Sequence, residues 1–124
     1  MITVHHVLEI HQVLIKEFGG IQGVRDSALL EAAINRPQSG FGENQFYPSC
    51  EQRAAAIVES IVRNHPFLDG NKRIGYVLMQ LMLMEDGKSI RATEDEKYNF
   101  IIHVAEGKLN FEEILDWIRN RTNH

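Results

Sequence analysis

The sequence predicts an all-α protein, a compact bundle of about six helices in a single domain that spans residues 1–124. Two observations indicate this fold class. Apolar residues recur at helical spacing along most of the chain, and capping patterns precede several of these segments. No internal repeat or low-complexity linker divides the sequence. A chain of 124 residues with 44% hydrophobic content can form one core of modest size.

Two helices are expected in the first third of the chain. Apolar side chains follow helical spacing over residues 4–18, and Gly19–Gly20 ends that segment. A short second helix over residues 27–35 begins at a possible aspartate or serine cap, and Pro37 prevents it from continuing. Residues 38–48 contain two glycines and lack helical spacing, so we expect a loop or a short hairpin there.

Four more helices are expected in the remainder. Ser49–Gln52 is a capping box, and the helix that it opens should end at about Asn64. An apolar helix follows, from residue 71 or 72 to residue 87. Thr93–Glu96 is a second capping box, and Asn110 together with Glu113 caps the last helix. The apolar helix that starts at residue 71 or 72 should lie at the centre of the bundle.

Composition excludes several classes of protein. A net charge of -4 argues against bulk attraction to nucleic acid or to an anionic membrane. The single cysteine, Cys50, excludes an internal disulfide framework and suits a reducing compartment. The N-terminus does not resemble a signal peptide, and the longest apolar run, near residues 77–84, is too short to span a bilayer. We therefore expect a cytoplasmic protein.

Residues 65–75, His-Pro-Phe-Leu-Asp-Gly-Asn-Lys-Arg-Ile-Gly, are the most informative part of the chain. A helix that begins just after Gly70 directs its free N–H groups and positive dipole end at the preceding loop. Lys72 and Arg73 add two cations in the first turn, where a helix normally favours acids. This arrangement indicates that the missing anion is a ligand, most simply a phosphate chain.

The other members of the motif fit phosphorus chemistry. Asp69 is a hard oxygen ligand suited to Mg²⁺, which usually takes one or two carboxylates together with substrate phosphates. His65 is the titratable group of this loop that can act as a general base near neutral pH. Pro66 should end the preceding helix, and Phe67 is most simply a core anchor. These parts favour transfer of a phosphorus group to a hydroxyl.

The run His65–Arg73 resembles the signature of the Fic/Doc superfamily, HPFx(D/E)GN(G/K)R. Residues 23–31, GVRDSALLE, and residues 35–38, NRPQ, are similar to the N-terminal segment of its Doc, or death-on-curing, branch. The resemblance covers nearly the whole chain. It implies the Fic fold, a helical core with a central motif helix and a short flap.

Differences within the motif bear on the reaction. Members that transfer AMP usually carry Gly at the position of Lys72 and often a second Arg at that of Tyr76, whereas Doc-like members resemble this chain. Gly70 instead favours AMP transfer, because the namesake of the Doc branch has Ala at this position. The resemblance implies a toxin that transfers the γ-phosphate of ATP, with Mg²⁺, to a translation factor such as elongation factor Tu. AMP or other nucleotidyl transfer to a protein hydroxyl stays open as the alternative.

The resemblance also implies roles for single residues. His65 would take the proton from the target hydroxyl, and Asp69 would bind Mg²⁺ or orient the base and substrate. The remaining motif members would line the anion hole and neutralise phosphate charge: Gly70, Asn71 (holding a phosphate oxygen), Lys72 and Arg73. Among the other histidines, His5, His6 and His11 lack metal-ligand spacing with a carboxylate on one helix face. We expect no chemical role for any of the other histidines.

The loop over residues 38–48 is a second candidate site. In the superfamily this segment is a flap that aligns the target by backbone pairing, so Phe41, Phe46 and Tyr47 would contact a partner chain. The alternative is a surface loop whose aromatic side chains pack on the core. Ser39–Asn44 matches a self-inhibitory pattern, (S/T)xxxE(G/N), but its two glycines oppose the required helix. We therefore expect inhibition by a separate antitoxin.

A non-catalytic domain that binds a phosphorylated ligand or a partner is the hypothesis from another class. The complete set of His65, Asp69, Asn71 and Arg73 argues against it, because a pure binding module has no need of a base.

Overall fold

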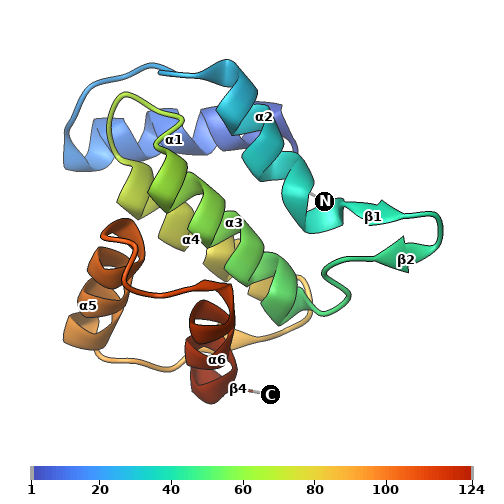
Figure 1. Ribbon diagram of the computed structural model, residues 1–124. Helices are drawn as coiled ribbons and strands as arrows, with labels where there is room; N and C mark the ends of the chain where they lie inside the picture. Colours follow the sequence, from blue (N-terminus) through green and yellow to red (C-terminus); the bar gives the residue numbers. More distant parts are fainter. Residues whose placement is uncertain (1, 124) are drawn as a thin grey trace.

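The computed structural model describes residues 2–123, and it is a bundle of helices with two small two-stranded sheets (Figure 1). The prediction of an all-α fold is confirmed. The six α-helices are α1 (Val4–Phe18), α2 (Ser27–Asn35), α3 (Cys50–Asn64), α4 (Asn71–Met84), α5 (Glu94–Ala105) and α6 (Phe111–Arg121). Four short strands and a 3₁₀ turn complete the described part: η1 (Arg36–Gln38), β1 (Gly40–Phe41), β2 (Asn44–Gln45), β3 (Ser89–Ile90) and β4 (Thr122–Asn123).

Local capping explains where most helices begin. The expected capping boxes form at the starts of α3, α5 and α6, where each cap side chain accepts a backbone N–H and the third helical residue bonds back. Thr3 and Asp26 cap α1 and α2 through single side-chain bonds. Among the six α-helices of the described residues, α4 alone begins with neither a side-chain cap nor an acidic residue in its first turn.

The core lies between α3 and α4, which run side by side through the middle of the molecule, with α1 and α2 on one side and α5 and α6 on the other (Figure 1). Gly75 allows this close approach, because a Cβ atom there would lie 2.5 Å from Cγ2 of Val62. The apolar faces of both helices are buried, as the sequence predicts. The two central helices therefore hold the motif loop between them in a fixed frame.

Two details differ from the sequence prediction. Helix α4 ends at Met84, three residues before the expected Gly87, and a turn closed by the N–H of Gly87 on the Met84 carbonyl follows. Strands β3 and β4 pair antiparallel and join the α4–α5 connection to the end of α6. The sequence did not predict this pairing, because strands of two residues are too short to show an alternating pattern. Among the described residues, no helix combines the length and the apolar character needed to cross a membrane.

Candidate functional site

The motif loop joins the C-terminus of α3 to the N-terminus of α4. Helix α3 ends at Asn64 as predicted, and His65 takes the left-handed conformation, with φ 50° and ψ 60°. Phe67 is only 1% exposed, which confirms its role as the anchor of the loop. His65 itself is exposed, so its imidazole is open to solvent at a fixed point of the backbone.

The segment after α1 pairs with this loop along its length. Val24 and Phe67 form an isolated antiparallel bridge, and the N–H of Leu68 donates to the carbonyl of Gly23 over 3.0 Å. The carbonyl of Pro66 accepts the N–H groups of Arg25 and Asp26. We call residues 19–26 the clamp segment, because these bonds hold the loop from one side.

Arg25 of the clamp segment fixes the backbone at His65. Its Nε donates to the His65 carbonyl over 2.6 Å, and its Nη2 donates to the Asn64 carbonyl over 2.7 Å. These are two of the carbonyls that a helix leaves without partners at its C-terminus. A guanidinium matches this pair with a planar fork of donors and adds favourable charge at the negative end of the dipole.

Asp69 is held by backbone donors on both sides. Its Oδ2 accepts the N–H of Ile21 over 3.1 Å, and its Oδ1 accepts the N–H of Gly70 over 2.8 Å. A carboxylate has about four lone-pair sites, so both oxygens keep capacity for a cation. The described residues contain no group of three or more His, Cys, Asp or Glu side chains placed to hold a metal. Asp69 therefore fits Mg²⁺ only in the mode in which substrate phosphates supply the other ligands.

The first turn of α4 combines open N–H groups with positive charge. Gly70 precedes it with φ +76°, a conformation that glycine adopts without strain. Lys72 and Arg73 are exposed, and the Arg73 guanidinium lies 4.3 Å from the centre of the Phe18 ring at the end of α1. A cation–π contact leaves the N–H donors of a guanidinium available to an anion. An uncapped helix N-terminus with two cations in its first turn is an arrangement that suits an anion.

Asn71 has a different immediate function from the expected one. It is 8% exposed, its Oδ1 accepts the N–H of Phe67, and its Nδ2 donates to the Phe67 carbonyl, both over 3.0 Å. These two bonds close the loop on itself. One Nδ2 hydrogen is left for a phosphate oxygen, so the expectation that Asn71 holds phosphate stays a prediction.

A groove of about 340 Å³ runs beside this site between α4 and α5. Its end nearest the motif carries Lys72 and Arg73, and the rest is mainly apolar and aromatic: Tyr76, Val77, Glu94, Lys97, Tyr98, Ile101 and Ile102. Burial, with a smaller effect of nearby Glu94, raises the pKa of Tyr76 to about 12. Its buried hydroxyl has no hydrogen-bond partner among the described residues. The groove thus offers an apolar wall next to a cationic end.

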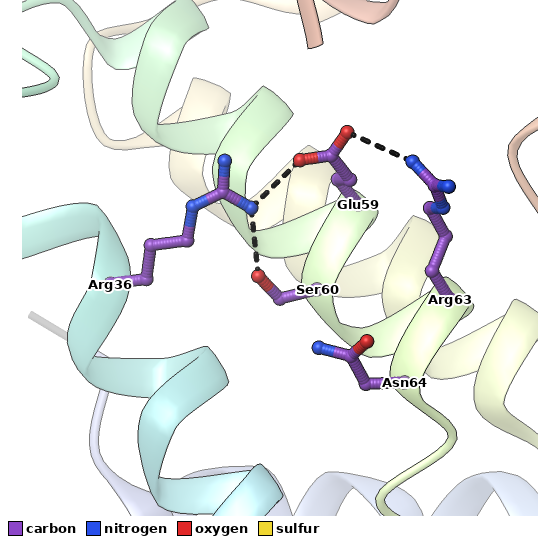
Figure 2. A pocket seen from close by; sticks show the side chains of 5 residues that line it. All are labelled: Arg36, Glu59, Ser60, Arg63 and Asn64. Atoms are coloured by element: carbon purple, nitrogen blue, oxygen red, sulfur yellow. Dashed lines mark hydrogen bonds and ion pairs between the residues drawn. The ribbon is translucent and has the colours of Figure 1, made fainter. Parts of the chain in front are cut away.

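A second, polar groove of about 320 Å³ lies along the last turns of α3 and ends at Asn64, next to His65. Figure 2 shows how Arg36 reaches across from η1 to Glu59 and Ser60, while Arg63 approaches Glu59 from the other side. The Arg36 Nη1 lies 2.9 Å from Glu59 Oε1 and 3.0 Å from Ser60 Oγ. These bonds fix η1 against α3.

The expected flap residues lie apart from the motif. Strands β1 and β2 form the hairpin, which projects beside the N-terminal end of α3 (Figure 1), whereas His65 follows the C-terminal end, about 22 Å along a 15-residue helix. Phe41 and Phe46 are 80% and 59% exposed. Tyr47 is half-buried: its hydroxyl accepts from Arg36 Nε, and its ring packs against Phe111. The hairpin is present, but it does not cover the motif loop, and Tyr47 packs on the core.

Sequence reasoning missed the residues that hold the loop. His11 is 2% exposed and contacts both Phe67 and Asp69, and Arg25 binds the end of α3. A signal was present for His11, because it occupies the buried face of α1 with Val7 and Ile15, and a buried polar side chain requires a partner. No local pattern indicated the partners of Arg25.

Taken together, the geometry defines an all-α protein with an uncapped, cationic helix N-terminus, flanked by an exposed histidine and by a carboxylate that backbone N–H groups hold. Residues 1–83 match the model of the Fic/DOC family. This match covers more than half of the chain, and it includes the clamp segment, α3 and the whole motif loop. The chain belongs to the Fic/DOC family.

Two relatives place it with the Doc branch. The chain is 40% identical over 78 residues to the protein named toxin Doc from Mycolicibacterium smegmatis, a match that covers 63% of this chain and 60% of that relative's length. It is 25% identical over 118 residues to the protein named protein kinase doc from Escherichia phage P1, over 95% of this chain and 92% of the relative. The chain thus spans less than two thirds of the mycobacterial relative.

Proposed function

We propose that this protein is a Doc-like toxin that transfers the γ-phosphate of ATP to a hydroxyl of a protein target, with a translation factor as the target class. One observation carries the proposal: the uncapped N-terminus of α4, with Lys72 and Arg73 in its first turn, lies on the same loop as exposed His65. An anion site and a base belong together in phosphoryl transfer to a hydroxyl. The names of the two relatives, a toxin and a protein kinase, agree with it.

ATP suits the arrangement of charge and apolar surface. The open N–H groups of α4 and the two cations would receive the phosphates. The groove between α4 and α5 has an apolar lining beside that cationic end, which suits a nucleoside. Asp69 would hold Mg²⁺ together with phosphate oxygens, and the ion would supply charge neutralisation to the transferring group.

The residues of the chain then have separate tasks. His65 would accept the proton of the target hydroxyl, a contribution of about 100-fold or more to the rate. Lys72 and Arg73 would neutralise charge on the phosphates, and the clamp segment would keep His65 and Asp69 at fixed positions around them. The polar groove that ends at Asn64, next to His65, would receive part of the target chain.

Transfer of AMP is the competing reaction of the same fold. Gly70 is shared with members that transfer AMP, whereas Lys72 stands where they usually carry Gly. We expect purified protein, incubated with Mg²⁺, bacterial extract and ATP, to transfer label from the γ-phosphate and not from the α-phosphate. Transfer of the α label would overturn the kinase proposal. The Lys72→Gly variant, made in parallel, should lose γ transfer, because it removes the cation that distinguishes the two site types.

A separate antitoxin is part of the proposal, because the (S/T)xxxE(G/N) pattern lies on the β1–β2 hairpin and not on a helix. Expression of the protein alone should therefore arrest growth, and the His65→Ala variant should not. Equal toxicity of the two forms would instead favour a non-catalytic domain that binds a phosphorylated ligand or a partner.

A further inference from the structure

We infer that His11, on α1, is a positioning residue for the phosphate site, and that it acts by fixing the peptide group between Asp69 and Gly70. This inference rests on the proposed function for its consequence, but its structural part stands on contacts alone. The imidazole is 2% exposed, and its Nε2 lies 2.8 Å from the carbonyl oxygen of Asp69. A carbonyl oxygen only accepts, so Nε2 carries the hydrogen.

A second contact fixes the ring itself. The His11 imidazole stacks on the Phe67 ring, with 3.8 Å between the ring centres and 8° between their planes. Phe67 is buried at 1% exposure and tied to Asn71 by two hydrogen bonds. The donor of His11 therefore has a fixed direction, set by the same loop whose carbonyl it binds.

The bonded carbonyl belongs to the Asp69–Gly70 peptide group, which leads into Gly70, the N-cap residue of α4. The C=O and N–H of a trans peptide point in opposite directions. With its oxygen held by α1, this peptide turns the N–H of Gly70 to Oδ1 of Asp69, and Gly70 takes φ +76°. A flip of the peptide would release the oxygen from His11 and break the N–H bond to Asp69. Glycine, which has no Cβ, tolerates both orientations, so another group has to select one.

The selected orientation matters for an anion. A carbonyl oxygen bound to His11 cannot turn towards the open N–H groups of α4, where it would repel a phosphate and compete for donors. The same bond keeps the Asp69 carboxylate next to Ile21 and Gly70. His11 thus determines both the donor-only character of the helix start and the place of the carboxylate, although it does not face the anion site.

Three variants test this with inorganic tripolyphosphate as the probe. His11→Phe keeps a ring to stack on Phe67 but removes the donor, His11→Gln restores an N–H donor, and His6→Phe makes the same change at an exposed position of α1. The amide signals of residues 70–73 in NMR spectra report the peptide orientation and tripolyphosphate binding, and thermal denaturation reports folding. The slowly exchanging Nε2 hydrogen of His11 should be visible in the wild-type protein.

We expect His11→Phe to shift the Gly70 amide signal and to weaken tripolyphosphate binding by about tenfold, with His11→Gln near the wild type and His6→Phe equal to it. An unchanged Gly70 signal in a folded His11→Phe protein would overturn the inference. So would equal loss of binding in both His11 variants, since that would indicate a packing role only. If the wild type binds no tripolyphosphate, the proposed function fails, and the Gly70 signal still decides the structural part.

Discussion

Replacement of Arg25 by Ala should disable the site more than it destabilises the fold. Arg25 contributes two hydrogen bonds, of 2.6 and 2.7 Å, to the carbonyls of His65 and Asn64. Bonds to a charged donor contribute about 1.5 to 3 kcal/mol each when buried, but these are exposed, so we expect a loss of about 1 to 2 kcal/mol for the pair. For a chain of this size, the melting temperature should fall by about 5 °C.

The chain offers a matched control in Arg53. Its Nη1 also donates to two backbone carbonyls, those of Tyr47 at 3.1 Å and Pro48 at 2.8 Å, but these lie before the N-terminus of α3. Arg53→Ala removes the same chemistry at the far end of that helix. The two variants should therefore lose similar stability, and only one of them should lose activity.

The assay is γ-phosphate transfer measured beside thermal denaturation followed by circular dichroism. We expect Arg25→Ala to lose about 10- to 100-fold in transfer rate, because a displacement of about 1 Å at a catalytic group costs this much. Arg25→Lys, which keeps the charge but not the planar fork, should be intermediate. If Arg25→Ala transfers phosphate as fast as Arg53→Ala, the claim that Arg25 positions His65 is wrong.

Three further predictions follow from local geometry. His65→Ala should abolish transfer and also cost about 1 kcal/mol of stability, because Ala disfavours the left-handed conformation, whereas His65→Asn should be inactive with less loss; denaturation of the three forms decides this. Burial, helped by the Glu51 carboxylate that accepts its S–H, raises the pKa of Cys50 to about 12, so the thiol should not react with a disulfide reagent at pH 8 in the folded protein. Since the unfolded thiol ionises near its ordinary pKa of about 9, the contribution of Cys50 to stability should be fully present below that pH and fall as pH rises towards 12. Over this range the free energy of unfolding of the wild type should therefore fall more steeply with pH than that of Cys50→Ala. Gly75→Ala should destabilise the protein by about 1 to 3 kcal/mol despite the better helix propensity of Ala, because the new Cβ would lie 2.5 Å from Val62, and a simultaneous Val62→Ala change should restore part of the loss.

The starts of the helices were predictable because they depend on a few neighbouring residues. Ser49 with Gln52 and Asn110 with Glu113 form their capping boxes within four positions, and the structure has them as predicted. The end of α4 was placed three residues too late, because Gly87 ends the turn after the helix and not the helix itself. Strand β4 could not be predicted, since its partner β3 lies more than thirty residues away.

The candidate site also has features that local sequence predicts and features that depend on the folded chain. The motif itself predicted the cationic first turn of α4 and the end of the helix before His65, because both depend on residue types within nine positions. The bond from His11 to Asp69 spans 58 positions and that from Arg25 to His65 spans 40, so they exist only in the folded chain. Phe41 and Phe46 are exposed as a flap would require, yet their distance from the motif depends on the direction of the hairpin, which local sequence does not specify.

The absence of a side-chain cap on α4 explains why the long-range bonds of His11 and Arg25 are needed. A capped helix start is stable locally, but its N–H groups are then occupied, so a helix that must bind an anion cannot use a side-chain cap. The five other α-helices of the described residues have caps. The loop that leads into α4 is held instead by α1 and the clamp segment, through His11, Ile21 and Arg25. All of these lie within residues 1–83, which match the family, whereas α5, the far wall of the apolar groove, lies beyond them. The proposed phosphate site thus lies in the part of the chain that matches the family, whereas the groove proposed for a nucleoside also needs α5, which the family model does not cover.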